Sequence, residues 1–260
     1  MKQLLPILVM FCLSATALYA GQIEIRGTYQ GENLYVKNPF AAAGVGFCVY
    51  EVSVNGMTTT DEINSAAFEI DLAVYGFTLG DPIRVAINYK DGCLPRVLNP
   101  DVLNARASFE IVNLRFEGDK VMWTTKNEAG TLPFVVEQFR WNKWVAVGRV
   151  EGKGQPGEHH YSAPVRLHAG ENRFRLRQTD ARRKSKYSAE LLISSSRAPL
   201  TFSVASGGNE VVFSEATMYE LYDSHGRIVL KGFGDRLSID GLDRGWYYLN
   251  FDNQMEMFRK

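Results

Sequence analysis

Short stretches of this chain alternate apolar and polar residues, and this period of two constrains the fold more than any other feature. The pattern is clear in residues 23–26, 49–54, 67–72 and 83–89, with Gly, Asn and Asp clustered between them. Successive side chains of a β-strand point to opposite faces, so such stretches form antiparallel strands with one buried face. No long stretch after the first 20 residues keeps the spacing of an amphipathic helix. The sequence therefore predicts an all-β protein.

Residues 1–20 have the pattern of a secretory signal peptide. A positive start is followed by an apolar run over residues 4–13 and by small residues that lead to Ala20. The run is too short for a membrane span. Cys12 would suggest a lipoprotein, but the bulky Phe11 before it does not fit a lipoprotein cleavage site. We predict export past the inner membrane, to the periplasm, the outer membrane or the cell surface, and no integral membrane segment in the mature chain.

Removal of the signal peptide leaves two cysteines, Cys48 and Cys93. An even pair in an exported protein can form a disulfide. Both residues lie in the N-terminal part of the chain, so a bridge would staple that part. The alternative is two separate buried thiols, because sequence alone does not give their geometry.

Composition and breaks in the alternation indicate several modules. Of the 260 residues, 45% are hydrophobic and 22% are charged, which excludes wholesale disorder. Residues 98–107 and 194–199 carry proline and no alternation, and both resemble linkers. We predict three β-modules, over residues 21–104, 105–198 and 199–260.

Charge differs between these modules. The formal net charge of the whole chain is zero, which argues against a polyanionic partner. The middle module has 17 Lys and Arg against 10 Asp and Glu, whereas the first has 5 against 10 and the last has 6 against 9. Opposite charges attract, so the modules are predicted to pack on each other. Chance variation among small domains is the alternative.

The middle module contains Trp123 on an early strand, FVVE (134–137), NRFRLRQTD (172–180) and KYSAELLI (186–193), in that order. These residues resemble those of a fibronectin type III domain. The resemblance covers roughly 90 residues and implies a β-sandwich of about seven strands. In the third segment, Phe174 and its alternate neighbours face one side of the strand and the arginines face the other.

Seven basic residues are concentrated in residues 173–186. They are Arg173, Arg175, Arg177, Arg182, Arg183, Lys184 and Lys186. One interpretation is a surface for an anionic partner, which in an exported protein would be lipopolysaccharide or an acidic protein, including this chain's own neighbouring modules, rather than nucleic acid. The other is a solvated hairpin whose arginines discourage edge pairing.

The C-terminal module contains the segments YELYD (219–223), HGRIV (225–229) and LSIDGLDRGWYYLNF (237–251). In these segments it resembles the sorting domain of proteins exported by the type IX secretion system of Bacteroidota. The resemblance implies a small β-sandwich that serves as an export address. The Asn-Pro turn and long linker that usually precede this module are absent here. A retained structural domain with the same fold is therefore the alternative.

The N-terminal module contains VSVNGMTTTDEINSAAFEIDL (52–72) and LGDPIRVAINYKDGCLPRVLNP (79–100), which are predicted strands joined by turns. It resembles transthyretin-like, carboxypeptidase-regulatory or immunoglobulin-like modules, which implies a β-sandwich. Its segment KDGCLPRVLNP (90–100) is polar and rich in turn residues. Binding residues are often found in such loops. We therefore expect Asp91 and Arg96 to belong to a contact surface.

The usual signatures of catalysis and metal binding are missing from the sequence. His159 and His160 are adjacent and would point to opposite faces of a strand, while His168 and His225 fall in predicted turns. No Gly-x-Ser-x-Gly elbow and no EF-hand loop occur. Glu69 and its alternate carboxylate neighbour face outward, as on any solvated strand. We predict no enzyme activity, no metal and no cofactor.

These inferences predict a non-enzymatic cell-envelope protein of tandem β-modules that docks to other proteins. It would be either surface cargo or an accessory component of the type IX secretion and gliding system. Its partners would be envelope or outer-membrane proteins, including components of that system, and not nucleic acid. The alternative is a surface carbohydrate-binding or adhesion module, for which four tryptophans offer stacking rings. A third hypothesis is a small hydrolase with unrecognised carboxylates.

Overall fold

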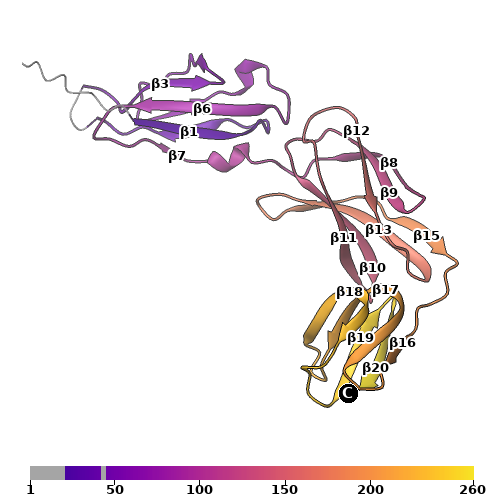
Figure 1. Cartoon of the computed structure of the whole chain (residues 1–260). Coiled ribbons are helices and arrows are strands. Elements are labelled where there is room, and N and C mark those ends of the chain that lie inside the picture. The colour runs from indigo at the N-terminus through magenta and orange to yellow at the C-terminus, as the bar shows by residue number, and fades with distance from the viewer. Residues whose placement is uncertain (1–20, 42–44) are drawn as a thin grey trace, which may run out of the picture. The chain divides into compact units, whose positions relative to one another are not determined.

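A computed structural model describes residues 21–41 and 45–260 of the chain, and the predicted signal peptide lies outside the described residues. The chain divides into two compact units, the first ending at Leu103 and the second running from Asn104 to Lys260; the short loop Thr78–Asp81 groups with the second unit. The described residues form strands, with two short 3-10 helices, η1 (Ala73–Tyr75) and η2 (Pro100–Leu103) (Figure 1). The predicted all-β chain of tandem sandwiches is confirmed.

The first unit is a sandwich of two antiparallel sheets. One sheet has the order β1-β6-β3-β4, formed by β1 (Gly21–Thr28), β6 (Pro82–Tyr89), β3 (Val49–Val54) and β4 (Met57–Thr58). The other has the order β5-β2-β7, formed by β5 (Ala67–Ile70), β2 (Leu34–Lys37) and β7 (Arg96–Val97). Their inner faces share one core, which includes Val36, Val52, Ile70, Val85 and Ile87.

Cys48 and Cys93 form a disulfide, as one of the two sequence interpretations predicted. Their Cα atoms lie 6.0 Å apart, and the Cys48 side chain is fully buried. The bridge ties the segment before β3 to the segment after β6.

The second unit begins with a sandwich of three and five strands. The smaller sheet has the order β12-β9-β8, formed by β12 (His159–Pro164), β9 (Lys120–Lys126) and β8 (Glu110–Glu117). The larger contains β11 (Lys143–Glu151), β10 (Pro133–Arg140), β13 (Gly170–Thr179), β14 (Ser185–Tyr187) and β15 (Leu191–Ser195). Trp123 is 1% exposed and lies at the centre of the core between the sheets.

The C-terminal sheet also has five strands. They are β16 (Phe202–Val204), β17 (Glu210–Tyr222), β18 (Ile228–Ser238), β19 (Trp246–Phe251) and β20 (Gln254–Arg259). The pairing of β17 with β18 shifts register between Val212 and Thr217. Such an irregularity bends a strand pair, and residues from both sides of it, including Val211 and Leu221, share one core.

Two sequence expectations are corrected by the strand bounds. The strand expected over residues 67–72 ends at Ile70. Ser194, expected in a linker, lies in β15 and pairs with Glu171.

Candidate functional site

Two hairpin turns of the second unit meet where its two sandwiches join. Trp141 and Asn142 form the turn between β10 and β11, with φ of 50° and 60°. Positive φ at both positions is the type I′ geometry, which matches the twist of the flanking strands but is uncommon for a bulky residue such as Trp. The backbone N–H of Trp141 donates a hydrogen bond of 3.2 Å to Oδ1 of Asn253, which lies in the turn between β19 and β20. We call this junction the seam. It consists of the turn at Trp141 and Asn142, the turn at Asp252 and Asn253, and the side chains that contact them.

A buried arginine crosses the seam. Arg140 is 4% exposed, and its guanidinium donates to Gln138 Oε1 at 2.7 Å, to the Arg166 carbonyl at 3.2 Å and to the Asp252 carbonyl at 3.4 Å. Burial lowers the pKa of Arg140 to about 10, and the negative charge of Asp252 opposes that effect. The group therefore stays protonated at neutral pH and links both sandwiches through carbonyl acceptors.

Asp252 connects three segments at the same place. Its Oδ2 accepts hydrogen bonds from the N–H groups of Leu200 at 3.3 Å and Ala169 at 3.5 Å. Its own N–H donates to Thr217 Oγ1 at 3.2 Å. The segment that joins the sandwiches is thus held against both of them.

A second cation, Lys143, lies beside the seam. Its Nζ donates to Glu220 Oε2 at 2.5 Å and to the Tyr222 hydroxyl at 3.1 Å, and the Tyr222 hydroxyl donates to the same Glu220 oxygen at 2.6 Å. Burial alone would raise the pKa of Glu220, but the hydrogen bonds from Lys143 and Tyr222 outweigh it and hold the pKa below 4.5. Burial alone would lower the pKa of Lys143, but its hydrogen bonds with Glu220 and Tyr222 outweigh burial and raise that pKa above 10.5.

Basic residues of the middle segment therefore meet acidic residues of the C-terminal segment. Arg197 gives a second example, since its Nη2 lies 2.7 Å from Glu215 Oε2. The predicted attraction between these two oppositely charged segments is confirmed at both pairs.

Acid is expected to remove the contribution of the Lys143–Glu220 pair to stability. The pKa of Glu220 is lowered in the folded state, so its contribution is complete above 4.5 and is lost as pH falls through the lower folded value. We expect Lys143→Met to cost about 0.5–1 kcal/mol near neutral pH and almost nothing below the folded pKa. Urea unfolding of both proteins at the two pH values measures this. An equal loss of stability at both pH values would contradict a stabilising role for the Lys143–Glu220 ion pair.

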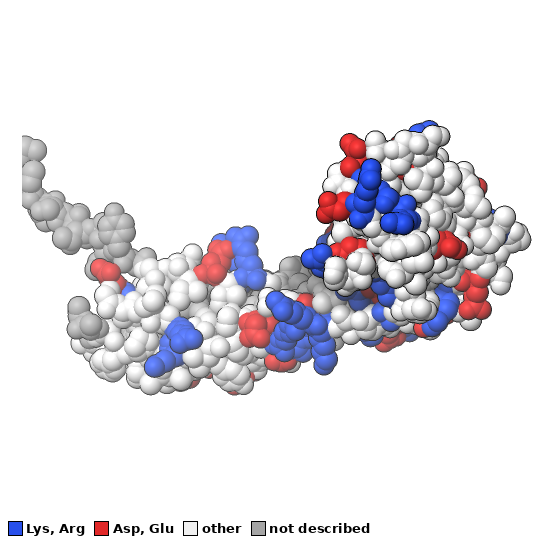
Figure 2. Space-filling model, turned by 90° about the horizontal axis from the view of Figure 1, so that it is seen from below, with Lys and Arg blue, Asp and Glu red and all other residues white. Residues whose placement is uncertain are grey.

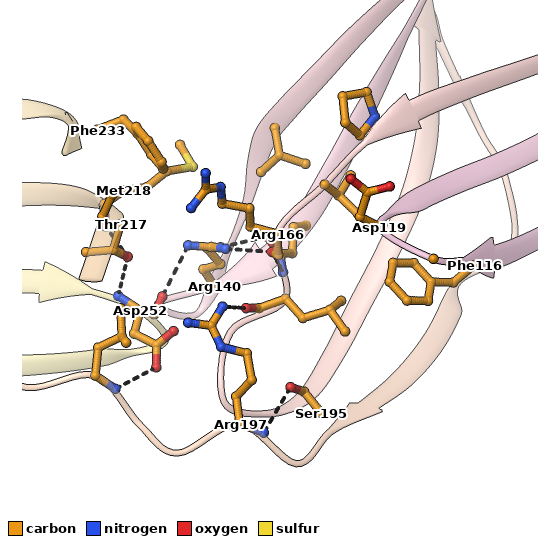
Figure 3. Close-up of a pocket in the computed structure, with 18 residues that line it drawn as sticks. Phe116, Asp119, Arg140, Arg166, Ser195, Arg197, Thr217, Met218, Phe233 and Asp252 are labelled. Carbon is orange, nitrogen blue, oxygen red and sulfur yellow. Dashed lines mark hydrogen bonds between the residues drawn. The ribbon is translucent and has the colours of Figure 1, made fainter. Parts of the chain in front are cut away.

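A cavity of about 740 Å³ adjoins the seam. Figure 3 shows the side chains of Arg140, Arg166 and Arg197 between the strands of the two sandwiches, with Asp252 and Thr217 on the C-terminal side. Apolar side chains line much of the rest, including Phe116, Val147, Val165, Leu167, Leu200, Met218 and Phe233. This volume is typical of ligand or side-chain binding pockets.

The cavity offers positive charge next to apolar surface. The Arg166 guanidinium lies 5.0 Å from the centroid of the Phe233 ring, and that ring is 54% exposed. The Ser195 and Thr217 hydroxyls accept hydrogen bonds from backbone N–H groups, and Thr217 donates to the Met218 carbonyl rather than to a basic side chain. The arrangement suits the binding of a carboxylate beside an apolar group better than nucleophilic chemistry.

The structure places the predicted arginines of β13 on the outer face of the sheet. Arg173, Arg175 and Arg177 alternate with Phe174 and Leu176, which are fully buried. This face pattern was predicted from the sequence and is confirmed.

Each of these arginines already contacts aromatic rings or carboxylates of its own sandwich. The Arg175 guanidinium lies 4.1 Å from the Trp144 ring centroid and 4.2 Å from that of Tyr187. Arg175 and Arg177 both donate to the Glu137 carboxylate, at 2.8 and 2.7 Å. Arg173 pairs similarly with Glu190 at 2.8 Å. Their role in partner binding stays a prediction, and these contacts give them a stabilising role in the sheet.

The other predicted contact residues are exposed. They are Arg182, Arg183, Lys184 and Lys186 on the β13–β14 hairpin, and Asp91 and Arg96 in the first unit. On the face shown in Figure 2, Lys and Arg side chains lie beside Asp and Glu side chains in mixed groups.

Sequence reasoning missed the residues that build the seam. Arg140, Lys143 and Asp252 look like ordinary hairpin residues, because turns are usually solvated. The sequence signal for these residues was a pair of two-residue hairpin turns, Trp141-Asn142 and Asp252-Asn253, each flanked by strands with alternating apolar and polar residues.

Comparison with known proteins finds no matching family model and no matching curated protein. Among the described residues, no helix is long and apolar enough to span a bilayer, and no group of His, Cys, Asp and Glu could hold a metal.

Several solved structures are similar over much of the chain. A tetra-tandem repeat from the extending region of a large adhesion protein is 10% identical, with a TM-score of 0.35, over 93% of this chain and 74% of that one. The FN1–FN3 domains of chicken CNTN1 are 11% identical, with a TM-score of 0.24, over 93% and 97%. A β-glucuronidase from Ruminococcus gnavus is 13% identical, with a TM-score of 0.21, and this chain spans 38% of its length.

Proposed function

We propose that this chain is an exported, non-enzymatic envelope protein that docks to another protein through the cavity at the seam. The observation that carries the proposal is the seam itself, where Arg140 is buried against the backbone of the C-terminal sandwich. In this role the C-terminal sandwich stays in the mature protein as part of the binding surface and is not an export signal that is cleaved off.

Loss of residues 199–260 would break the contacts that cross the seam, although Arg140 would keep Gln138 and the Arg166 carbonyl as acceptors. Arg140 would lose the Asp252 carbonyl, and Lys143 would lose Glu220. The cut would also expose to water the side chains of the middle sandwich that residues 199–260 cover at the seam, including Arg140. This supports a resident accessory component over cargo whose last module is cut away. We assign that role to the type IX secretion and gliding system, because the C-terminal module resembles its sorting domain.

The cavity fits an acidic side chain or a chain terminus of the partner. Arg166 would bind a carboxylate, and Phe233 with Met218 would cover an adjacent apolar group. The partner is then an envelope or outer-membrane protein, in the periplasm or at the cell surface. The Cys48–Cys93 disulfide is consistent with an oxidising compartment of that kind.

Charge reversal in the cavity is the test. Arg166→Glu is expected to lower recovery of the partner about tenfold when tagged chain is cross-linked in envelopes and the captured protein is identified by mass spectrometry. Arg149→Glu is the matched control, since Arg149 is 64% exposed on β11 and pairs with Glu151 at 3.1 Å. The mature chain is expected to retain residues 199–260 by intact mass. Equal recovery with both variants, or loss of residues 199–260, would overturn the proposal.

A further inference from the structure

Exposed apolar side chains gather at the end of the first unit that carries the disulfide. Phe40 is 64% exposed, Val45 is 95% exposed and Leu94 is 68% exposed. Phe40 forms an isolated β-bridge with Phe47, and their ring centroids lie 5.1 Å apart. Phe47 and Leu94 each neighbour a disulfide-bonded cysteine in the sequence. We call these four side chains the apolar end, and a grouped apolar surface of this kind marks a contact with protein or lipid.

Backbone hydrogen bonds pair polar groups of the segment that carries Phe40 and Phe47. The Ala41 N–H donates to the Gly46 carbonyl at 3.0 Å, and the N–H that follows Phe47 donates to the Pro39 carbonyl at 2.9 Å. An unpaired backbone group would oppose transfer of this segment out of water. These bonds remove part of that opposition, so the segment is suited to apolar surroundings as well as to water.

Basic residues lie around the apolar end. Residues 21–104 contain five of them, and two, on β1 and β6, pair with a carboxylate of β1. Of the other three, Lys90 donates from Nζ to the Val45 carbonyl at 2.9 Å. Arg96 lies directly opposite Lys37 where β7 pairs with β2, and Lys37 ends β2 shortly before the apolar end begins. We call Lys37, Lys90 and Arg96 the basic collar.

The described chain begins at the same end of the first unit. β1 starts at Gly21, which pairs with Tyr89, and Tyr89 also pairs with Val49. Cys48 directly precedes Val49, and its carbonyl accepts a hydrogen bond from the Lys90 N–H at 2.9 Å. The predicted signal peptide directly precedes Gly21, and such a peptide is removed during export across a membrane. A chain still joined to this peptide would therefore present the apolar end to the bilayer.

We propose that the apolar end binds the surface of an anionic lipid bilayer. Phe40, Val45 and Leu94 enter the layer between the headgroups and the acyl chains, and the basic collar lies among the phosphate groups. The contact holds the exported chain at a membrane without crossing it. It is separate from protein docking through the cavity at the seam.

A groove of another protein and a second copy of this chain are the other occupants to consider. Either would cover the apolar side chains. Neither accounts for the basic collar and the start of the described chain lying at the same end, whereas a bilayer accounts for both. Of the two contact residues predicted in this unit, Arg96 belongs to the collar, and Asp91 adds one negative charge beside three positive ones.

The test is flotation of the mature chain, residues 21–260, with lipid vesicles. The vesicles consist of phosphatidylcholine with about 30% phosphatidylglycerol, which gives them a negative surface. We expect the floated fraction to rise saturably, with half-saturation at about 1 mM lipid, from partial burial of three apolar side chains. Leu94→Asp and Phe40→Asp are each expected to raise that concentration at least about tenfold, because each removes an apolar contact and adds a negative charge.

Val74→Asp is the matched control. Val74 is 66% exposed on η1, close to the exposure of Leu94. β5 begins opposite Lys37 and ends at Ile70, so η1, which follows β5, lies away from the collar. This variant should float as wild type does. Hydrogen exchange of β3 and β6 checks that each variant is folded.

Loss of flotation in both variants of the apolar end, with flotation kept in the control, would support the proposal. It is overturned if wild type does not float below about 10 mM lipid, well above the expected half-saturation, or if both variants float as wild type does. Sedimentation velocity without vesicles tests the second copy. A wild-type dimer that Leu94→Asp converts to a monomer would assign the apolar end to self-association and overturn the lipid contact. Arg166→Glu should float normally, so failure of the membrane contact and failure of docking at the seam are distinguishable.

Discussion

Removal of the Cys48–Cys93 disulfide is expected to lower the free energy of unfolding of the first unit by about 4 kcal/mol, from the loop-closure entropy of the unfolded chain. The two cysteines are separated by 45 residues, so the bridge closes a long loop. That loop contains the whole of β3, β4, β5 and β6, which supply much of the core of this small unit. A loss of this size is a large part of the stability of a typical domain.

Hydrogen exchange on the whole chain measures this effect locally. In the variant with both Cys48→Ser and Cys93→Ser, the most protected amides of β3 and β6 are expected to exchange about a thousandfold faster. The core strands of the second unit, such as β10, serve as an internal control and should keep their protection. A reductant should reproduce the effect in wild type and do nothing further in the double variant. Unchanged protection of the amides in β3 and β6 would show that the disulfide does not stabilise the first unit by lowering the entropy of its unfolded chain.

Local patterns predicted most of the strands because a strand with one buried face carries its signal in its own residues. The strand expected over residues 49–54 has those bounds, and the one expected over residues 83–89 is one residue longer. The alternation around Phe174 also gave the correct buried face of β13. The ends of strands were predicted less well. The turn at Trp141 has positive φ, which sequence reasoning does not expect from a tryptophan.

The seam could not be predicted because its partners are far apart in the sequence. Arg140 and Asp252 are separated by 112 residues, and each lies at a hairpin where solvent exposure is the ordinary expectation. The sequence left two interpretations of the basic run open. It could not show that Glu137 on β10 and Trp144 on β11 contact the first arginines, because these residues come together only when the sheet forms. The charge difference between segments indicated contact between them, and the two-residue turns were the local signal for the residues of the seam.

A buried carboxyl group that the sequence did not single out stabilises the sandwich of the second unit. Glu128 is 2% exposed and follows β9. It accepts hydrogen bonds from the Tyr161 hydroxyl at 2.8 Å, from the Gly154 N–H at 2.8 Å and from the Thr125 hydroxyl. One side chain therefore joins β9, β12 and the loop after β11. Burial is the main reason that the pKa of Tyr161 rises to about 12, so its hydroxyl remains a donor.

Glu128→Ala is expected to destabilise the second unit by about 3–5 kcal/mol, because three buried donors lose their acceptor and a cavity opens. Urea unfolding followed by the fluorescence of buried Trp123, which stacks on Tyr161 with centroids 5.4 Å apart, measures the change. Tyr161→Phe is the matched control and should cost only about 1–2 kcal/mol, since it removes a single hydroxyl. In the double variant the costs should fall short of additivity, because the two residues share a hydrogen bond. A cost below about 1 kcal/mol for Glu128→Ala would mean that water replaces the carboxyl group and that the three segments are held by apolar packing alone.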